Sequence, residues 1–179
     1  MYALIKDGAV VTYPYSISLF RQANHNISLP EEPTAMQLAE VGLFDVYMVL
    51  PPVADPVNEV VEEVTPEFVN DRWQQAYEIR PATGQEAAAN LAKVTAVFEK
   101  EARAYLDEFA QTRNYDDITS AATYATSTVA IYQREGQYAV EARDQVWQAV
   151  YQTLDDYNQG VITILPNVRD ILPQLTWPE

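Results

Sequence analysis

Prolines divide this chain into two stretches of different physical character. Eight of its 11 prolines fall within residues 1–81, and residues 82–165 contain none. A proline inside a helix removes a backbone donor, clashes with the preceding turn and costs about 3 kcal/mol. The first stretch is therefore expected to consist of short elements, whereas the second can form long helices.

The composition is that of a folded protein without thiol chemistry. Hydrophobic residues make up 48% of the 179 positions, which is enough for a packed core. The absence of cysteine excludes disulfides, zinc-thiolate sites and thiol catalysis. The first residues lack the pattern of a signal peptide, and no run approaches the roughly 18 apolar residues of a membrane span. We expect a soluble protein, compatible with a reducing cytoplasm.

The negative charge is spread along the whole chain. Residues 1–82 carry 12 acidic and 4 basic side chains and residues 83–179 carry 14 and 7, so the net charge of -15 divides into -8 and -7. Phosphate binding requires clustered lysine and arginine, so we expect neither nucleic acid nor a membrane surface as partner. An acidic surface favours solubility, with a basic partner or mutual repulsion within an assembly as alternatives.

The first 82 residues predict a small antiparallel β module with short helical inserts. Residues 2–13 read as a hairpin around Asp7-Gly8, and Pro14 is expected to end its second strand. A second hairpin is expected from residues 57–65 and 72–79, because the latter segment alternates strictly and follows the turn residues Asn70-Asp71. Together these strands predict one small meander with a covered face; an aromatic strand face is more typical of core packing than of a binding platform.

Short helices are expected between these strands. Ser16 can cap a helix that extends to Asn24, and Thr34 can cap another that extends to Glu40, with Gly42 at its C-terminal end. The segment 44–49 that follows is rich in β-forming residues.

Residues 83–179 predict a C-terminal bundle of about three helices, so that the fold class is α+β with domains at 1–82 and 83–179. Thr83-Gly-Gln-Glu86 fits a capping box, and an apolar stripe continues from there to Thr112. A second helix is expected from Asp116 or Asp117 to near Gly136, and a third from about Tyr138 to Asn158. The tail predicts one short helix within residues 166–173, and Trp177 is expected to plug its own domain.

Residues for catalysis or metal binding are sparse. The single histidine, His25, lies between two asparagines, so no pair of histidines and no Ser-His-Asp arrangement is supported. Adjacent carboxylates occur at Glu31-Glu32, Glu62-Glu63, Asp116-Asp117 and Asp155-Asp156, and solvated or capping charges explain them better than a hydrolase site does. Glycine-rich phosphate loops and calcium-loop patterns are absent. We therefore predict no catalytic, cofactor-binding or metal-binding residues, and a protein that is not an enzyme.

Several strings in both halves of the chain resemble those of one known protein family. They are the opening Met1-Tyr-Ala-Leu-Ile-Lys-Asp-Gly-Ala-Val-Val-Thr-Tyr-Pro-Tyr15, the segment from Trp73 to Thr83, and the close Leu175-Thr-Trp177-Pro178. In the second half, Tyr115-Asp-Asp-Ile118, Thr123-Tyr-Ala-Thr-Ser-Thr128 and Asp144-Gln-Val-Trp147 are also similar. Together they resemble the tail fibre assembly proteins of tailed bacteriophages, also described as tail fibre chaperones, although the proline-free half is longer here.

This resemblance implies a protein that binds the end of a trimeric tail fibre and assists its folding, trimerisation or attachment. Its expected partner is the phage tail fibre protein, with a homo-oligomer as a further expectation, and its expected location is the host cytoplasm during assembly, with retention in the virion tail left open. The N-terminal sheet edge and the long amphipathic helix are both candidate contact surfaces. A permanent structural component of the tail or baseplate and a carbohydrate-binding tail component are the alternatives.

Overall fold

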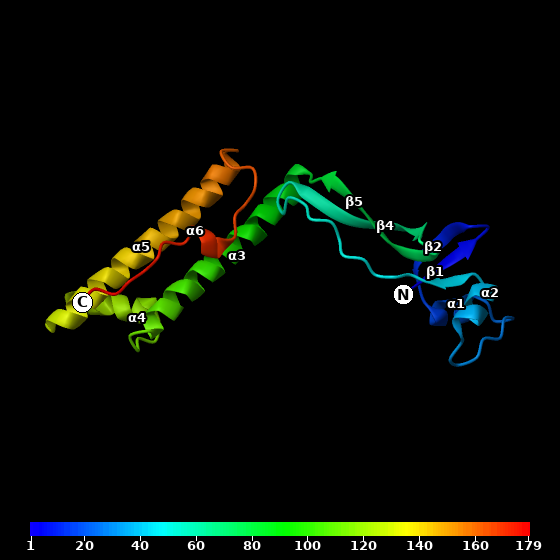
Figure 1. Cartoon of the computed structure of the whole chain (residues 1–179), viewed down its shortest axis with the longest axis horizontal. Helices are drawn as coiled ribbons and strands as arrows, with labels where there is room; N and C mark the ends of the chain where they lie inside the picture. Colours follow the sequence, from blue (N-terminus) through cyan, green and yellow to red (C-terminus); the bar gives the residue numbers. More distant parts are fainter. The chain divides into compact units, whose positions relative to one another are not determined.

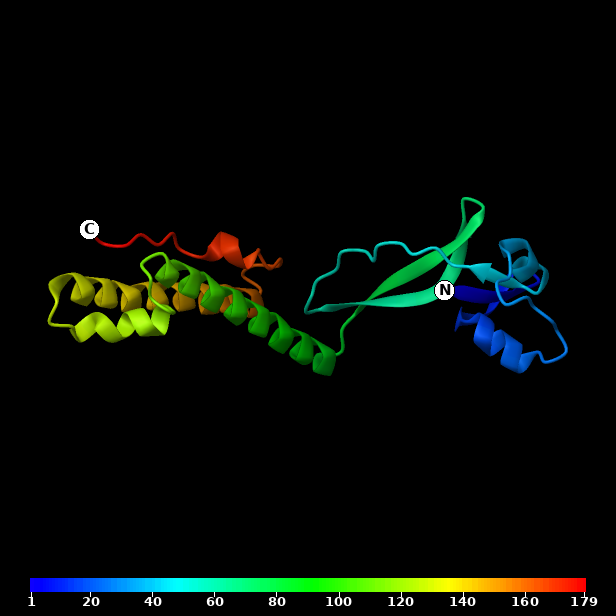
Figure 2. The same ribbon diagram turned by 90° about the horizontal axis from the view of Figure 1, so that it is seen from below.

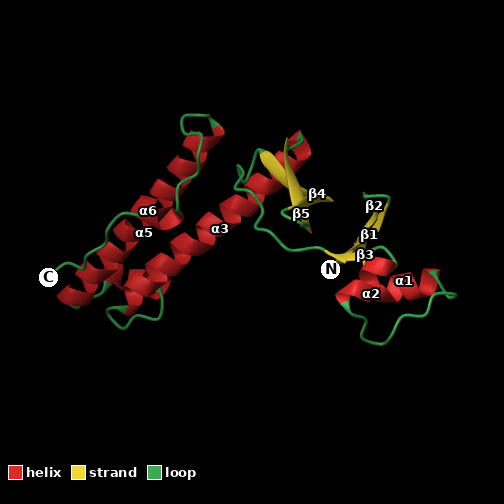
Figure 3. Ribbon diagram, turned by 45° about the vertical axis from the view of Figure 1, so that its right-hand side comes forward, coloured by secondary structure: helices red, strands yellow, loops and turns green.

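The computed structural model describes residues 1–179 and has an α+β fold, as the sequence predicts (Figure 1). The chain forms two compact units, Met1–Thr83 and Gly84–Glu179. Strands occur only in the first unit, and the longest helices in the second (Figure 3). None of the helices combines the length and the apolar character needed to cross a membrane.

The first unit begins with the expected hairpin. Strands β1 (Tyr2–Lys6) and β2 (Ala9–Tyr15) pair antiparallel, and the turn residues Asp7 and Gly8 have φ values of 51° and 75°, as a two-residue hairpin turn requires. The prediction that Pro14 ends the second strand is wrong, because β2 continues to Tyr15. Strand β2 lies at the edge of its sheet, so the N–H group that Pro14 lacks is not needed for a hydrogen bond to a neighbouring strand.

The two short helices form with the expected caps. Helix α1 (Ile17–Ala23) is capped by the side chain of Ser16, and α2 (Ala35–Glu40) begins with a capping box between Thr34 and Gln37. Gly42, at φ 79°, then reverses the chain into β3 (Leu43–Asp45), which is shorter than the predicted strand 44–49. A side chain at position 42 would clash with the carbonyl oxygen of Ile5, 2.5 Å from an added Cβ.

The expected single meander is instead two sheets. Strands β2, β1 and β3 form one sheet in that order, and β4 (Glu59–Val69) and β5 (Arg72–Pro81) form a separate hairpin with Asn70 and Asp71 in its turn. Strand β4 extends beyond the predicted 57–65 because a bulge between Val64 and Glu67 accommodates Pro66. Tyr47 joins the sheets, since its amide donates to the Trp73 carbonyl (3.0 Å) and its carbonyl accepts from the Gln75 amide (2.9 Å).

The second unit contains two long helices, α3 (Gly84–Gln111) and α5 (Ala130–Asn158), whose apolar sides pack together (Figure 2). Between them lie the short helix α4 (Ile118–Thr123), capped by Asp117, and the 3-10 turn η1 (Tyr124–Thr126). The tail contributes α6 (Val168–Ile171), capped by Asn167. The core consists of α3, α4, α5 and tail residues: Phe98, Ala102, Leu106, Ala110, Ile118, Ala121, Ala139, Val146, Val150, Leu154 and Val168.

The prediction of a helix that ends near Gly136 is wrong. Gly136 lies inside α5, which begins at Ala130 and continues without a break to Asn158. A Cβ at this position would lie 2.2 Å from the backbone nitrogen of Ala125 and 2.3 Å from the carbonyl carbon of Tyr124. The glycine therefore serves close packing of η1 against α5 and does not end a helix.

Candidate interaction site

The residues that the sequence singled out for chemistry lie apart from one another. His25, Glu31 and Glu32 are exposed in the loop between α1 and α2. Asp117 caps α4, and Asp155 and Asp156 accept hydrogen bonds from glutamine side chains one turn away on the helix surface. No group of three or more histidine, aspartate or glutamate side chains is placed to hold a metal ion.

The pair Glu62 and Glu63 points to opposite sides of β4. The Glu62 carboxylate accepts from Arg80 Nε (2.7 Å) on β5. The Glu63 carboxylate accepts from Gln75 Nε2 (2.8 Å) and from the Tyr13 hydroxyl of β2. Burial, and next the hydrogen bond to Glu63, raises the pKa of Tyr13 above its usual value. The Tyr13–Glu63 bond connects the three-stranded sheet to the β4–β5 hairpin, and the other two bonds lie within the hairpin, so the pair has a structural role.

An aromatic groove of about 710 Å³ opens on the first unit. Its apolar wall includes Phe44, Phe68 and Trp73, with the rings of Phe68 and Trp73 5.4 Å apart at an angle of 58°. Phe68 is 57% exposed, although it is one of the largest apolar side chains of the unit. Large aromatic side chains in a concave surface are typical of binding sites, so this groove is a candidate site for a partner.

The rim of the aromatic groove carries charge. Lys6 and Asp7 reach it from the β1–β2 turn, and Glu40 reaches it from the end of α2. All three residues are exposed, and none of their side chains forms a hydrogen bond or ion pair. The groove therefore offers two free carboxylates and one free ammonium group to a ligand.

A second exposed apolar feature is the extended segment after Tyr47. Met48, Leu50 and Val53 are 83%, 93% and 98% exposed, and Pro51 and Pro52 lie between the last two. The segment starts beside β5, where the Val49 amide donates to Gln75 Oε1 (3.2 Å). Strands β2 and β4 are also unpaired along their outer edges. Such edges and apolar side chains are features that partner proteins can cover.

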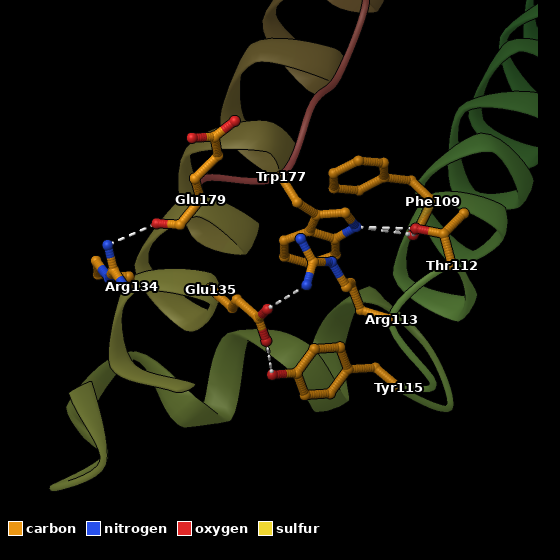
Figure 4. Close-up of polar contacts among 8 residues, drawn as sticks. All are labelled: Phe109, Thr112, Arg113, Tyr115, Arg134, Glu135, Trp177 and Glu179. Carbon is orange, nitrogen blue, oxygen red and sulfur yellow. Dashed lines mark hydrogen bonds and ion pairs between the residues drawn. The ribbon is translucent and has the colours of Figure 1, made fainter. Parts of the chain in front are cut away.

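The second unit closes on its own C-terminal segment, as the sequence predicts for Trp177. The indole ring stacks on Phe109, with ring centres 4.3 Å apart, and its Nε1 donates to Thr112 Oγ1 at 2.9 Å (Figure 4). At the chain end, Arg134 Nη1 donates to the Glu179 carbonyl oxygen at 2.6 Å. The cluster thus holds the C-terminal segment against α3 and α5, which is a structural role.

A buried carboxylate lies beside this cluster. Glu135 on α5 is only 5% exposed, and its two oxygens accept from the Tyr115 hydroxyl (2.7 Å) and pair with Arg113 (3.4 Å) (Figure 4). Burial, followed by the hydrogen bond to Glu135, raises the pKa of Tyr115 well above its usual value. Because both oxygens of Glu135 have partners, the group anchors the loop after α3 to α5.

Comparisons with protein-family models, with curated proteins and with solved structures find no match for this chain. The candidate site therefore depends on the geometry of the first unit. Sequence reasoning missed Phe68, because the predicted strand 57–65 stops before it, whereas β4 continues to Val69. The signal that was available is the pair of β-forming residues Phe68 and Val69 directly before the Asn70-Asp71 turn.

Proposed function

We propose that this protein acts by binding another protein, as a phage tail fibre assembly chaperone or fibre-associated subunit. In this role it binds the end of a trimeric fibre and assists folding, trimerisation or attachment. It works in the host cytoplasm during assembly and acts without catalysis. The resemblance of several sequence segments to tail fibre assembly proteins supports the choice of partner.

The observation that carries the proposal is the exposed apolar segment of the first unit. Met48, Leu50 and Val53 are almost fully exposed within six residues of one another, in a chain with a net charge of -15. Apolar side chains grouped on an otherwise charged surface are typical of protein-binding sites. An unassembled fibre exposes strand edges and apolar tips that aggregate, and a soluble acidic protein that covers them would suppress this reaction.

Co-expression with a phage tail fibre protein tests the proposal. We expect more soluble fibre trimer in the presence of this chain, and co-purification of the two proteins. Replacing Met48, Leu50 and Val53 with serine should weaken both effects. The matched control replaces Val161 and Ile164, which are 68% and 81% exposed in the second unit, and should leave both unchanged. If the fibre trimerises equally well alone and the proteins never co-purify, the proposal is rejected.

A permanent structural component of the tail or baseplate is the second candidate, favoured by the first turns of α3. None of residues 84–97 is buried, whereas Phe98, Ala102 and Leu106 further along the same helix are. Apolar residues on those turns, such as Leu91 and Val97, would suit a contact that forms in a lasting assembly. Mass spectrometry of purified particles separates the candidates, because a structural component is present in stoichiometric amounts and a chaperone is not.

A further inference from the structure

We propose that the aromatic groove of the first unit binds a basic segment of the partner, with an arginine or lysine side chain over Phe68 and close to the carboxylates of Asp7 and Glu40. The groove residues come from the β1–β2 turn, the α2–β3 junction and the β4–β5 hairpin. This inference rests on the proposed function, since the partner is taken to be the fibre protein, and it names the surface and the chemistry of contact.

The aromatic wall supplies the first part of the recognition. A guanidinium or ammonium group above an aromatic face is attracted by the ring quadrupole, and tryptophan is the strongest partner. Phe68 and Trp73 form a tilted pair at the groove, and the exposed Phe68 ring has an open side. The same hairpin uses this chemistry internally, where the Arg72 guanidinium lies 4.8 Å from the centre of the Tyr47 ring.

The rim carboxylates supply the second part. Asp7 and Glu40 form no ion pair within the chain, so a cation that enters the groove meets carboxylates that no internal cation neutralises. Lys6 opposes them as the one cation of the lining, which leaves the groove with a net charge of -1 from two carboxylates and one ammonium group.

The charge of the surrounding unit favours the same ligand. Residues 1–82 carry 12 acidic and 4 basic side chains, a net charge of -8. This field attracts a basic segment and accelerates its association at low ionic strength. A neutral glycan would gain nothing from the field, so a basic peptide segment fits the observations better than a sugar.

The backbone around the groove is suited to close contact. Gly8, at φ 75°, has no atom within 4 Å of the position that a side chain would occupy, so this part of the turn is open. The Ile5 amide donates to the Gly42 carbonyl at 2.7 Å and fixes the α2–β3 junction against β1. The groove floor is thus held by backbone bonds, while its rim side chains remain free to meet a ligand.

Binding of the full-length chain to the purified fibre protein, measured by biolayer interferometry from 50 to 500 mM NaCl, tests the inference. Phe68→Ser should lower the affinity about tenfold. Asp7→Asn combined with Glu40→Gln should lower it several-fold at low salt and flatten its salt dependence, because fewer charges are then screened. Lys6→Gln should raise the affinity, since it removes the cation that repels the ligand.

Glu32→Gln is the matched control, because it removes one exposed carboxylate of the same unit away from the groove and should leave affinity almost unchanged. Thermal unfolding of each variant establishes that the fold is intact. If the wild-type chain binds the fibre and the groove variants bind equally well, the groove inference is overturned while the proposed function stands. If Phe68→Ser alone weakens binding, the ligand is apolar and the basic segment is wrong. If the wild-type chain does not bind the fibre, both the groove inference and the proposed function are overturned. If the wild-type chain binds glycans on an array and Phe68→Ser abolishes this binding, the ligand of the groove is a sugar and not a basic peptide.

Discussion

Gly136 provides a sharp test of how the helical unit packs. This residue lies in α5, against the 3-10 turn η1. A Cβ added to it would lie 2.2 Å from the Ala125 nitrogen, 2.3 Å from the Tyr124 carbonyl carbon and 2.8 Å from the Ala125 Cα. Non-bonded carbon atoms are normally about 3.5 to 4.0 Å apart. All three atoms belong to the backbone, so no change of side-chain rotamer relieves the clash.

The sign of the effect of Gly136→Ala depends on two opposing contributions. In the interior of an exposed helix, alanine would be more favourable than glycine by about 1 kcal/mol. Overpacking of a well-filled site costs about 1 to 3 kcal/mol, and three backbone contacts below 3.0 Å place this site at the upper end. We therefore expect a net loss of about 1 to 2 kcal/mol in the free energy of unfolding.

Urea unfolding followed by circular dichroism and by tryptophan fluorescence measures this loss. Trp147 and Trp177 report on the same unit as Gly136. The matched control is Gly84→Ala at the start of α3, where an added Cβ meets nothing within 4 Å and no loss is expected. A Gly136→Ala variant that is as stable as the wild type, or more stable, would refute the close packing of η1 against α5.

Three further predictions concern the second unit. Trp177→Ala removes the stacking on Phe109 and should lower the free energy of unfolding in urea by about 2 to 3 kcal/mol. This is less than for a fully buried tryptophan, because the ring is half-buried. An unchanged urea midpoint would contradict a stabilising role of Trp177 in its own unit. The pKa of Tyr115 is raised in the folded state, so the unfolded state loses this proton first as the pH rises. The free energy of unfolding should therefore be unaffected below about pH 10 and should fall above it. Tyr115→Phe should be less stable at pH 7 and show a smaller fall in stability above about pH 10, as checked by urea titrations between about pH 7 and pH 11. Arg169→Ala removes an exposed guanidinium that pairs with Glu108 at 2.9 and 3.0 Å. The variant should be slightly less stable in thermal unfolding, and its difference from the wild type should shrink as NaCl is raised. A loss of stability that does not depend on salt would show that Arg169 acts by packing and not by charge.

Local sequence signals predicted the parts of the fold that local physics controls. Ser16 and Thr34 cap helices because their hydroxyls satisfy free amides within the same turn. The turn at Asp7-Gly8 forms because both positions accept a positive φ. Each of these features depends on residues a few positions apart, so the sequence contains all the information needed.

The features that the sequence did not predict depend on contacts between distant segments. The predicted strand 57–65 stops before Pro66, but β4 continues past this proline through a bulge between Val64 and Glu67, which sequence alone does not reveal. Gly136 carries the usual signal of a helix end, and only the presence of η1 beside α5 shows that it is needed for close approach. In both cases a residue type that usually ends a strand or a helix lies inside one, because the surrounding structure accommodates or requires it.

The aromatic groove also depends on contacts between distant segments, which explains why no local sequence motif marks it. Its lining comes from positions as far apart as Ile5, Glu40 and Phe68, each of which has an ordinary local role at a strand end, a helix end or a hairpin. Only the pairing of β3 with β1 and the bonds from Tyr47 to β5 bring these ends together. Trp73 was assigned to core packing from its alternation, and it does contact the core of Ala3, Ile5 and Val46. The same ring also lines the groove, so Trp73 contributes both to the stability of the first unit and to the surface proposed for the partner. Phe68 is therefore the better position at which to alter binding, because its substitution should affect folding less than substitution of Trp73.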